Sequence, residues 1–252
     1  MAETSKESRD LPITVGDLHK SFGEQTVLNG INFQVERGET LAVLGRSGTG
    51  KSVLLKLLIG LRPADSGSIR IFGHEITSSD VKQLNEIRKK IGFLFQQAAL
   101  YDSMTVEQNV AFPLSRHAAL PENERKQRVR DLLAGVGMDG HLDKLPSQIS
   151  GGMQKRVGLA RALALEPEIV LFDEPTAGLD PITSTEIGKL ILELKEKRKM
   201  TAIVVTHDIS TAKLFSDRLL LLHEGNIRIE GTFDDLQKSQ DELVAQFLGE
   251  SS

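Results

Sequence analysis

Two kinds of hydrophobic pattern divide this chain of 252 residues. Apolar and polar residues alternate in residues 31–35 and 68–72, and each segment lies next to a glycine turn, which predicts short antiparallel strands. Continuous apolar runs occupy residues 40–44, 169–172, 202–205 and 219–222, and helical patterns separate the last three. Such a rhythm is typical of buried parallel strands. We therefore expect a parallel α/β sheet with a small antiparallel β layer beside it.

Helical spacing dominates the middle of the chain. Val129, Leu132, Leu133 and Val136 recur at helical spacing, and residues 97–166 contain few β-branched runs. This region is predicted to be a helical insertion that splits one sheet into two sequence segments. The expected division is a flexible N-terminus at 1–12, a β subdomain with the first part of the core at 13–96, a helical subdomain at 97–166, the second part of the core at 167–231 and an amphipathic C-terminal tail at 232–252.

Composition narrows the possible classes of protein. The apolar runs are far shorter than the roughly 18 residues that span a bilayer, and residues 1–10 are polar, so we expect neither a membrane span nor a secretory signal. The absence of cysteine excludes disulfides and thiolate metal sites. A net charge of −4, from 31 basic and 35 acidic residues, disfavours nucleic acid as a partner. These features predict a cytosolic protein.

A glycine-rich loop carries the first chemical signal. Residues 45–52 fit the pattern G-x-x-x-x-G-K-[ST] between a predicted strand and a predicted helix. Backbone N–H groups of such a loop wrap phosphates, while Lys51 would neutralise the β- and γ-phosphates and Ser52 would ligate Mg²⁺. ATP or GTP binding follows. The predicted nucleotide-binding residues here are Gly45, Arg46, Ser47, Gly48, Thr49, Gly50, Lys51 and Ser52.

Two further elements complete the predicted site. The apolar run 169–172 ends in Asp173 and Glu174, which places two carboxylates at the end of a buried strand. Asp173 would hold the metal ion, and Glu174 would polarise the attacking water. Ser150, Gly151 and Gly152 precede a long helical pattern and would form its N-terminus, a position that attracts phosphate.

These three elements, in this order, resemble the nucleotide-binding subunit of an ABC transporter over about residues 13–231. The resemblance implies a P-loop NTPase (RecA-like) α/β core with an antiparallel β subdomain and an inserted α-helical subdomain. It further implies that Phe22 stacks on adenine, that Gln96 is the Q-loop glutamine and helps to ligate Mg²⁺, that Asp180 belongs to the D-loop and that His207 is the switch histidine.

The resemblance also implies a second copy of the chain. In this family the signature of one subunit, here residues 150–153, faces the phosphate loop of another, so ATP is bound in a nucleotide-bridged dimer and hydrolysis releases it. One departure stands out, because the common signature ends in glutamine where this chain has Met153, with Gln154 one place later. Backbone N–H groups and Ser150 can still bind a γ-phosphate, so we expect activity to survive.

Residues 95–106 and 109–114, together with the signature methionine, are similar to the Mla/Mce-type lipid transport ATPases. That similarity implies phospholipid cargo, two multi-spanning permeases, an Mce-type lipid-binding protein and a place on the cytoplasmic side of the inner membrane, peripheral through the permease. Tyr101, Met104, Phe112 and Pro113 are candidates, as a group, for the permease contact. Ordinary core packing accounts for any one of them equally well.

Three alternatives remain. The chain could be the ATPase of a small-solute importer, for example for polar amino acids, which a neighbouring gene for a solute-binding protein would indicate. A soluble ABC ATPase acting on DNA or ribosomes is disfavoured, because those usually carry coiled-coil arms or two cassettes. A P-loop kinase ranks last, because it would have no use for a signature or a switch histidine.

The C-terminal tail could clasp the second subunit or a small regulatory partner.

Overall fold

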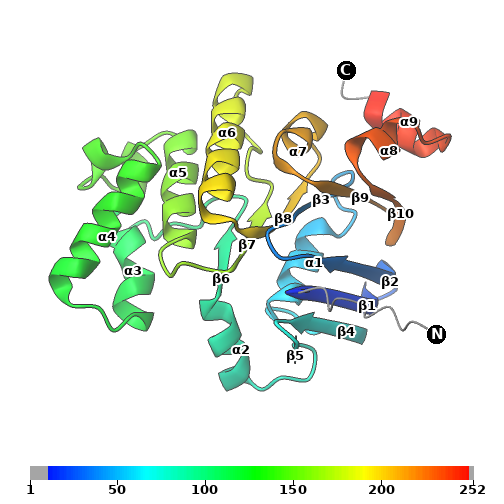
Figure 1. Cartoon of the computed structure of the whole chain (residues 1–252), viewed down its shortest axis with the longest axis horizontal. Helices are drawn as coiled ribbons and strands as arrows, with labels where there is room; N and C mark the ends of the chain where they lie inside the picture. Colours follow the sequence, from blue (N-terminus) through cyan, green and yellow to red (C-terminus); the bar gives the residue numbers. More distant parts are fainter. Residues whose placement is uncertain (1–10, 250–252) are drawn as a thin grey trace, which may run out of the picture.

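Two β-sheets form the centre of the molecule, a computed structural model that describes residues 11–249 (Figure 1). The four-stranded antiparallel sheet has the order β2 (Gln25–Val35), β1 (Ile13–Phe22), β4 (Ser66–Ile71), β5 (His74–Glu75). The six-stranded sheet has the order β10 (Asn226–Gly231), β9 (Arg218–His223), β3 (Thr40–Leu44), β8 (Thr201–Thr206), β7 (Ile169–Asp173), β6 (Ile91–Leu94). Among the strands of residues 11–249, only β10 runs antiparallel to its neighbour in this second sheet. The predicted pair of a parallel core sheet and an antiparallel layer is confirmed.

Helices surround the two sheets. Helices α1 (Lys51–Leu58), α2 (Val81–Lys89), α6 (Pro181–Arg198) and α7 (Ile209–Phe215) accompany the core strands. A helical group of α3 (Val106–His117), α4 (Glu122–Gly135) and α5 (Gly151–Ala162), with short 3₁₀ turns at Asp139–His141 and Pro146–Gln148, lies at one end of the molecule, away from the antiparallel sheet (Figure 1). Helices α8 (Phe233–Gln237) and α9 (Glu242–Gly249) end the described chain.

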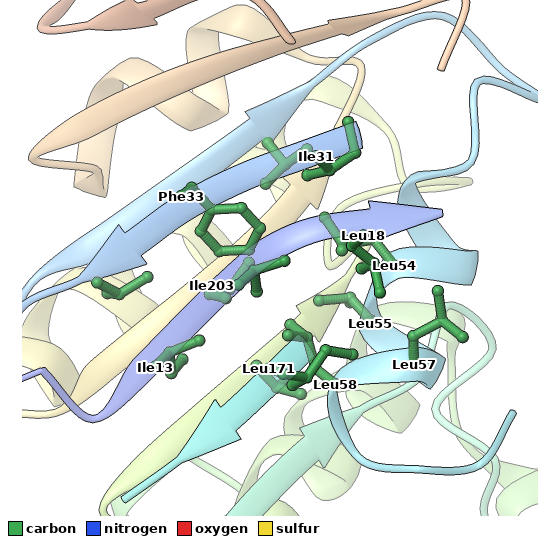
Figure 2. Close-up of a cluster of buried hydrophobic side chains, with 14 of the residues drawn as sticks. Ile13, Leu18, Ile31, Phe33, Leu54, Leu55, Leu57, Leu58, Leu171 and Ile203 are labelled. Carbon is green, nitrogen blue, oxygen red and sulfur yellow. The ribbon is translucent and has the colours of Figure 1, made fainter. Parts of the chain in front are cut away.

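One large hydrophobic cluster lies between the two sheets. Helix α1 contributes Leu54, Leu55, Leu57 and Leu58 to this cluster, which the inner faces of both sheets complete (Figure 2). Alternate residues of β7 point to opposite sides of the core sheet. Leu171 joins this cluster, while Phe172 joins a second cluster, to which α3, α4 and α5 contribute and which we call the cluster of the helical group. Burial on both faces explains why the core strands are continuous apolar runs.

The two C-terminal helices, α8 and α9, pack against the core sheet. Buried Leu236 of α8 and Val244 of α9 pack in a third cluster with β3 and β9, so the part of the predicted C-terminal tail up to residue 249 covers its own core. The predicted flexible N-terminus lies almost wholly outside the described residues. None of the helices between residues 11 and 249 combines the length and apolar character that a bilayer crossing requires.

Candidate nucleotide-binding site

The glycine loop joins the end of β3 to the start of α1. Gly50 has φ +99° and caps α1 without a side-chain hydrogen bond, so the first N–H groups of the helix face the loop. A Cβ at Gly45 would lie 2.6 Å from the Leu222 carbonyl oxygen, which leaves room only for glycine. Arg46, Ser47 and Gly48 are exposed, and the Thr49 hydroxyl donates to the Arg46 carbonyl at 2.9 Å. This loop and helix end form a concentration of backbone donors suited to phosphate.

Lys51 is buried under the loop. Its Nζ donates to the carbonyl oxygens of Gly45 at 2.7 Å and Arg46 at 3.0 Å. The same nitrogen lies 3.4 Å from Oε1 of Glu174. The Lys51 ammonium therefore lies between the glycine loop and the carboxylate of Glu174.

Ser52 and Asp173 face each other across the helix and strand ends. The Ser52 hydroxyl donates to Oδ1 of Asp173 at 2.6 Å. Burial raises the pKa of Asp173, and the hydrogen bond from Ser52 partly opposes that shift. A buried carboxylate beside a hydroxyl oxygen supplies the hard oxygen donors that Mg²⁺ prefers, so these residues fit the predicted ion.

Glu174 and His207 form the adjoining pair. Glu174 has φ +47°, its N–H donates to the Val205 carbonyl at 2.9 Å, and its side chain is buried. His207 Nδ1 lies 2.9 Å from Glu174 Oε2, and the imidazole is half exposed. The histidine at the end of β8 thus orients the carboxylate at the end of β7, as two parallel neighbours allow.

Gln96, beyond the end of β6, is exposed, and its backbone carbonyl is held by a residue that the sequence analysis left without a role. Lys155 Nζ donates to the Gln96 carbonyl at 2.5 Å and to the Glu174 carbonyl at 3.1 Å. Burial lowers the pKa of Lys155 to about 8, although Asp173 and Glu174 act in the opposite direction. A lysine among the buried positions of an otherwise apolar helix face was the signal available in the sequence.

The signature residues begin α5. The Ser150 hydroxyl accepts a hydrogen bond from the Met153 N–H at 3.3 Å, as an N-cap does, and Gly152 packs closely against Thr183. The Met153 side chain packs against the cluster of the helical group. Gln154 donates its amide back to the Pro146 carbonyl at 3.0 Å, so it does not substitute for the missing signature glutamine.

Asp180 caps the next helix. Its carboxylate accepts hydrogen bonds from the N–H groups of Ile182 and Thr183, both at 3.0 Å, and begins α6. The hydrogen bond from the Thr183 hydroxyl is the main reason that the pKa of Asp180 is lowered. This carboxylate is thus bound within its own helix end.

Phe22 ends β1 with a partly exposed ring. Lys20 Nζ and the Arg62 guanidinium carbon each lie 5.4 Å from the ring centroid. Asp65 fixes the strand end, because it accepts hydrogen bonds from Lys20 Nζ and from the Ser21 N–H, both at 2.6 Å. These contacts fix the end of β1, which carries Phe22, the residue expected to stack on adenine.

Side-chain contacts thus join one group of predicted residues. Glu174 contacts both Lys51 and His207, and Ser52 binds Asp173 in a second, neighbouring contact. Ser150 and Asp180 instead use their side chains at the N-termini of α5 and α6. One chain can position the loop, the carboxylates and the histidine, whereas the signature forms a separate surface.

Comparison with known proteins shows broad sequence similarity. The family model described as ABC transporter matches residues 28–177. The probable ribonucleotide transport ATP-binding protein mkl of Mycobacterium tuberculosis is 42% identical over 236 residues, which are 94% of this chain and 66% of the relative. The Arabidopsis thaliana chloroplastic protein TRIGALACTOSYLDIACYLGLYCEROL 3 is 41% identical over 258 residues, 94% of this chain and 73% of the relative. The methionine import ATP-binding protein MetN of Brucella abortus is 42% identical over 219 residues, 87% and 59% of the two chains.

A solved structure agrees with the fold. A dimeric ATP-binding cassette in a post-hydrolysis state, bound to ADP and Pi, superposes with a TM-score of 0.80 at 34% identity. The match covers 87% of this chain and 98% of that one. Mixed α/β architecture, an antiparallel sheet and a helical subdomain are therefore features of this cassette fold, as the sequence predicted.

Proposed function

Because this chain belongs to the ABC transporter family of ATP-hydrolysing subunits, we propose that it powers phospholipid transport by a membrane permease in an Mla/Mce-type system. The observation that carries this choice of cargo is the similarity to the Arabidopsis protein, whose name is that of a galactolipid and which matches 94% of this chain. The resemblance of residues 95–106 and 109–114 to the Mla/Mce-type ATPases points the same way.

ATP is proposed to bind on the glycine loop with adenine against Phe22. The triphosphate would replace the loop carbonyls and Glu174 as the acceptors of Lys51, which now lie within 3.4 Å of its Nζ. Ser52, Asp173 and Gln96 would hold Mg²⁺, which supplies charge neutralisation at the phosphates. Release of Glu174 from Lys51 would leave its carboxylate to accept a proton from water as that water attacks the γ-phosphorus, while the bond from phosphorus to the bridging oxygen breaks and ADP leaves. His207 keeps the carboxylate oriented through the 2.9 Å contact.

A second copy of the chain would complete each site. Ser150, Gly151 and Gly152 lie at the N-terminus of α5, where the N–H groups and the helix dipole favour an anion. Asp180 begins the neighbouring helix α6. These ends would face the γ-phosphate held by the partner subunit, so ATP favours the closed dimer and its hydrolysis allows opening. The dimeric cassette bound to ADP and Pi supports this arrangement.

The permease is proposed to dock on a groove beside the helical group. This groove has a volume of about 410 Å³, and its lining includes Tyr101, Phe112 and Pro113, whereas Met104 is not among the lining residues. The Tyr101 and Phe112 rings lie 4.8 Å apart, and Tyr101 is 45% exposed. An exposed tyrosine paired with a half-buried phenylalanine at a groove is suited to an apolar helix of a partner. Docking there would hold the ATPase on the cytoplasmic side of the inner membrane.

A small-solute importer is the second candidate. The methionine import and ribonucleotide transport names of two relatives favour it as directly as the Arabidopsis name favours lipid. Both candidates share the ATP chemistry, and they differ in the cargo and in the partner outside the membrane.

Purification of the tagged protein from membranes in mild detergent separates these candidates. Mass spectrometry of co-purifying proteins and lipids should identify a multi-spanning permease, an Mce-type protein and enriched phospholipid. Recovery of a solute-binding protein with the permease would instead establish the importer, and recovery only with ribosomes or DNA would contradict a transport role.

A further inference from the structure

One face of α5 holds the backbone segment that follows β6. Lys155 Nζ donates to the Gln96 carbonyl, while Arg161 donates from Nη2 to the Ala98 carbonyl at 2.7 Å and from Nη1 to the Ala99 carbonyl at 2.8 Å. Lys155 and Arg161 are six residues apart on this helix, and Gly158 lies midway between them. A Cβ at Gly158 would lie 3.1 Å from the Ala98 Cβ, so the helix backbone itself approaches the segment between the two cations.

The segment that these cations hold has a costly backbone conformation. Ala98 has φ +57° and Ala99 has φ +50°, which places two successive alanines in the left-handed region. Each such residue costs roughly 1–2 kcal/mol in an L-amino acid, so contacts must offset this cost beyond the local hydrogen bonds from the Ala98 and Ala99 N–H groups. Three hydrogen bonds from Lys155 and Arg161 supply those contacts.

Lys155 also connects this segment to the predicted general base. Lys155 is 5% exposed, and the second acceptor of its ammonium is the Glu174 carbonyl at 3.1 Å. A buried cation of this kind is costly to leave without its partners, so its two acceptors are held at a fixed separation. The same side chain therefore sets the backbones of Gln96 and Glu174 relative to one another.

We propose that Lys155 and Arg161 are positioning residues, which hold residues 96–99 in the strained conformation that sets Gln96 beside Glu174 for ATP hydrolysis. The proposal rests on the proposed function in one respect, because it takes Gln96 and Glu174 to act at the γ-phosphate. It assigns a role in the reaction to two side chains that would touch neither ATP nor the metal ion.

Steady-state ATP hydrolysis by the purified full chain tests the proposal. Lys155→Gln should lower kcat by roughly 100-fold, an effect comparable to a misplacement of catalytic groups by about 1 Å. KM for ATP should change by less than about twofold, because the two acceptors of Lys155 lie outside residues 45–52. Arg161→Gln should act in the same direction. Lys155→Arg, which keeps a cation, should recover a large part of kcat.

Arg156→Gln is the matched control on the same helix. Arg156 donates to the Val136 carbonyl and pairs with Glu186, so its loss should leave kcat and KM near those of the wild type. Amide hydrogen exchange at residues 97–101 is the second readout, and it should rise in Lys155→Gln and Arg161→Gln but not in Arg156→Gln.

Unchanged kcat and unchanged exchange in Lys155→Gln and Arg161→Gln would overturn the proposal. An equal loss of ATP binding and kcat in Lys155→Gln, without rescue by Lys155→Arg, would also overturn it, because that pattern marks a general structural role. Gln96→Ala is measured beside these variants as a separate test of the proposed function. Wild-type turnover of Gln96→Ala would contradict the proposed role of Gln96 whatever the other variants show.

Discussion

The phosphate-loop cluster and the signature end of α5 are held in different ways. In the first, buried Lys51, Asp173 and Glu174 are fixed by contacts with the loop, Ser52 and His207, which come from distant parts of the chain. In the second, exposed Ser150 caps only its own helix. In the proposed dimer, one chain would therefore preorganise the loop, the carboxylates and the histidine, whereas its signature would act only on a phosphate held by the second chain.

The largest expected effect comes from the charge at the centre of the first region. Lys51→Ala should lower turnover by roughly 100- to 1000-fold and weaken ATP binding, because it removes the cation beside the loop carbonyls. Steady-state hydrolysis and equilibrium binding of ATP measure both effects. Lys89→Ala, which removes a partly exposed lysine paired with Glu86 on α2, should leave both values unchanged.

A change in the second region should separate binding from turnover. Ser150→Ala should lower turnover by roughly 100-fold. Binding of ATP to a single subunit should stay within about twofold of the wild type, because the Lys51 contacts are intact. The loss of an N-cap also costs about 1 kcal/mol of stability, so Thr232→Ala, which removes the N-cap of α8, is the matched control. Equal turnover in the two variants would contradict a role for Ser150 at the partner's nucleotide.

Phe22 tests the outer edge of the first region. Stacking of a base on an aromatic ring contributes about 1–3 kcal/mol, so Phe22→Ala should raise KM for ATP by about tenfold with little change in kcat. Phe22→Tyr should restore KM, because it keeps the ring. A fall in kcat at unchanged KM would show that Phe22 acts elsewhere than at the base.

The smallest effect is on stability and depends on pH. The protonated form of Asp173 is favoured in the fold, so the associated stability is present below the ordinary pKa of 3.8 and is lost as pH rises through the raised pKa. At pH 7, and without Mg²⁺, Asp173→Asn should therefore raise Tm by a few degrees, since 1 kcal/mol corresponds to about 2–4 °C at this chain length. Thermal unfolding at pH 7 measures the shift, and hydrolysis should be lost.

Asp65→Asn is the control of opposite sign. The hydrogen bond from Lys20 lowers the pKa of Asp65, so its contribution to stability is present above pH 3.8 and is lost as pH falls through the lowered pKa. Removal of that charge should lower Tm at pH 7. A lower Tm for Asp173→Asn as well would contradict the view that burial of the Asp173 carboxylate is costly.

Sequence alone predicted the first region well because its signals are local. Glycine spacing determines the conformation of residues 45–50, and apolar runs that end in acidic residues or histidine place Asp173, Glu174 and His207 at strand ends. The strand β6 was missed because Ile91–Leu94 is four residues long and contains Gly92. The alternating strand β10 was missed for lack of a buried face, since its residues are exposed or half buried.

The contacts that α5 makes around the site could not be predicted from the sequence in the same way. Lys155 and Gln96 are 59 positions apart, and their contact depends on how α5 packs beside β6. Likewise, the sequence shows that Met153 replaces a glutamine, but only packing shows that Met153 joins the hydrophobic cluster while Gln154 turns back to Pro146. Periodicity indicates which face is buried, and it does not indicate which carbonyls a buried cation will reach.

The sandwich between two copies is the central claim, and the molecular mass of Glu174→Gln in solution tests it most directly. With ATP, this variant should bind nucleotide without turnover and sediment as a dimer of twice the 27.7 kDa chain. The double variant Glu174→Gln with Ser150→Arg should bind ATP and remain a monomer, because the added side chain blocks the signature end of α5. A monomeric Glu174→Gln at saturating ATP, or a dimer that forms equally well with Ser150→Arg, would contradict the account.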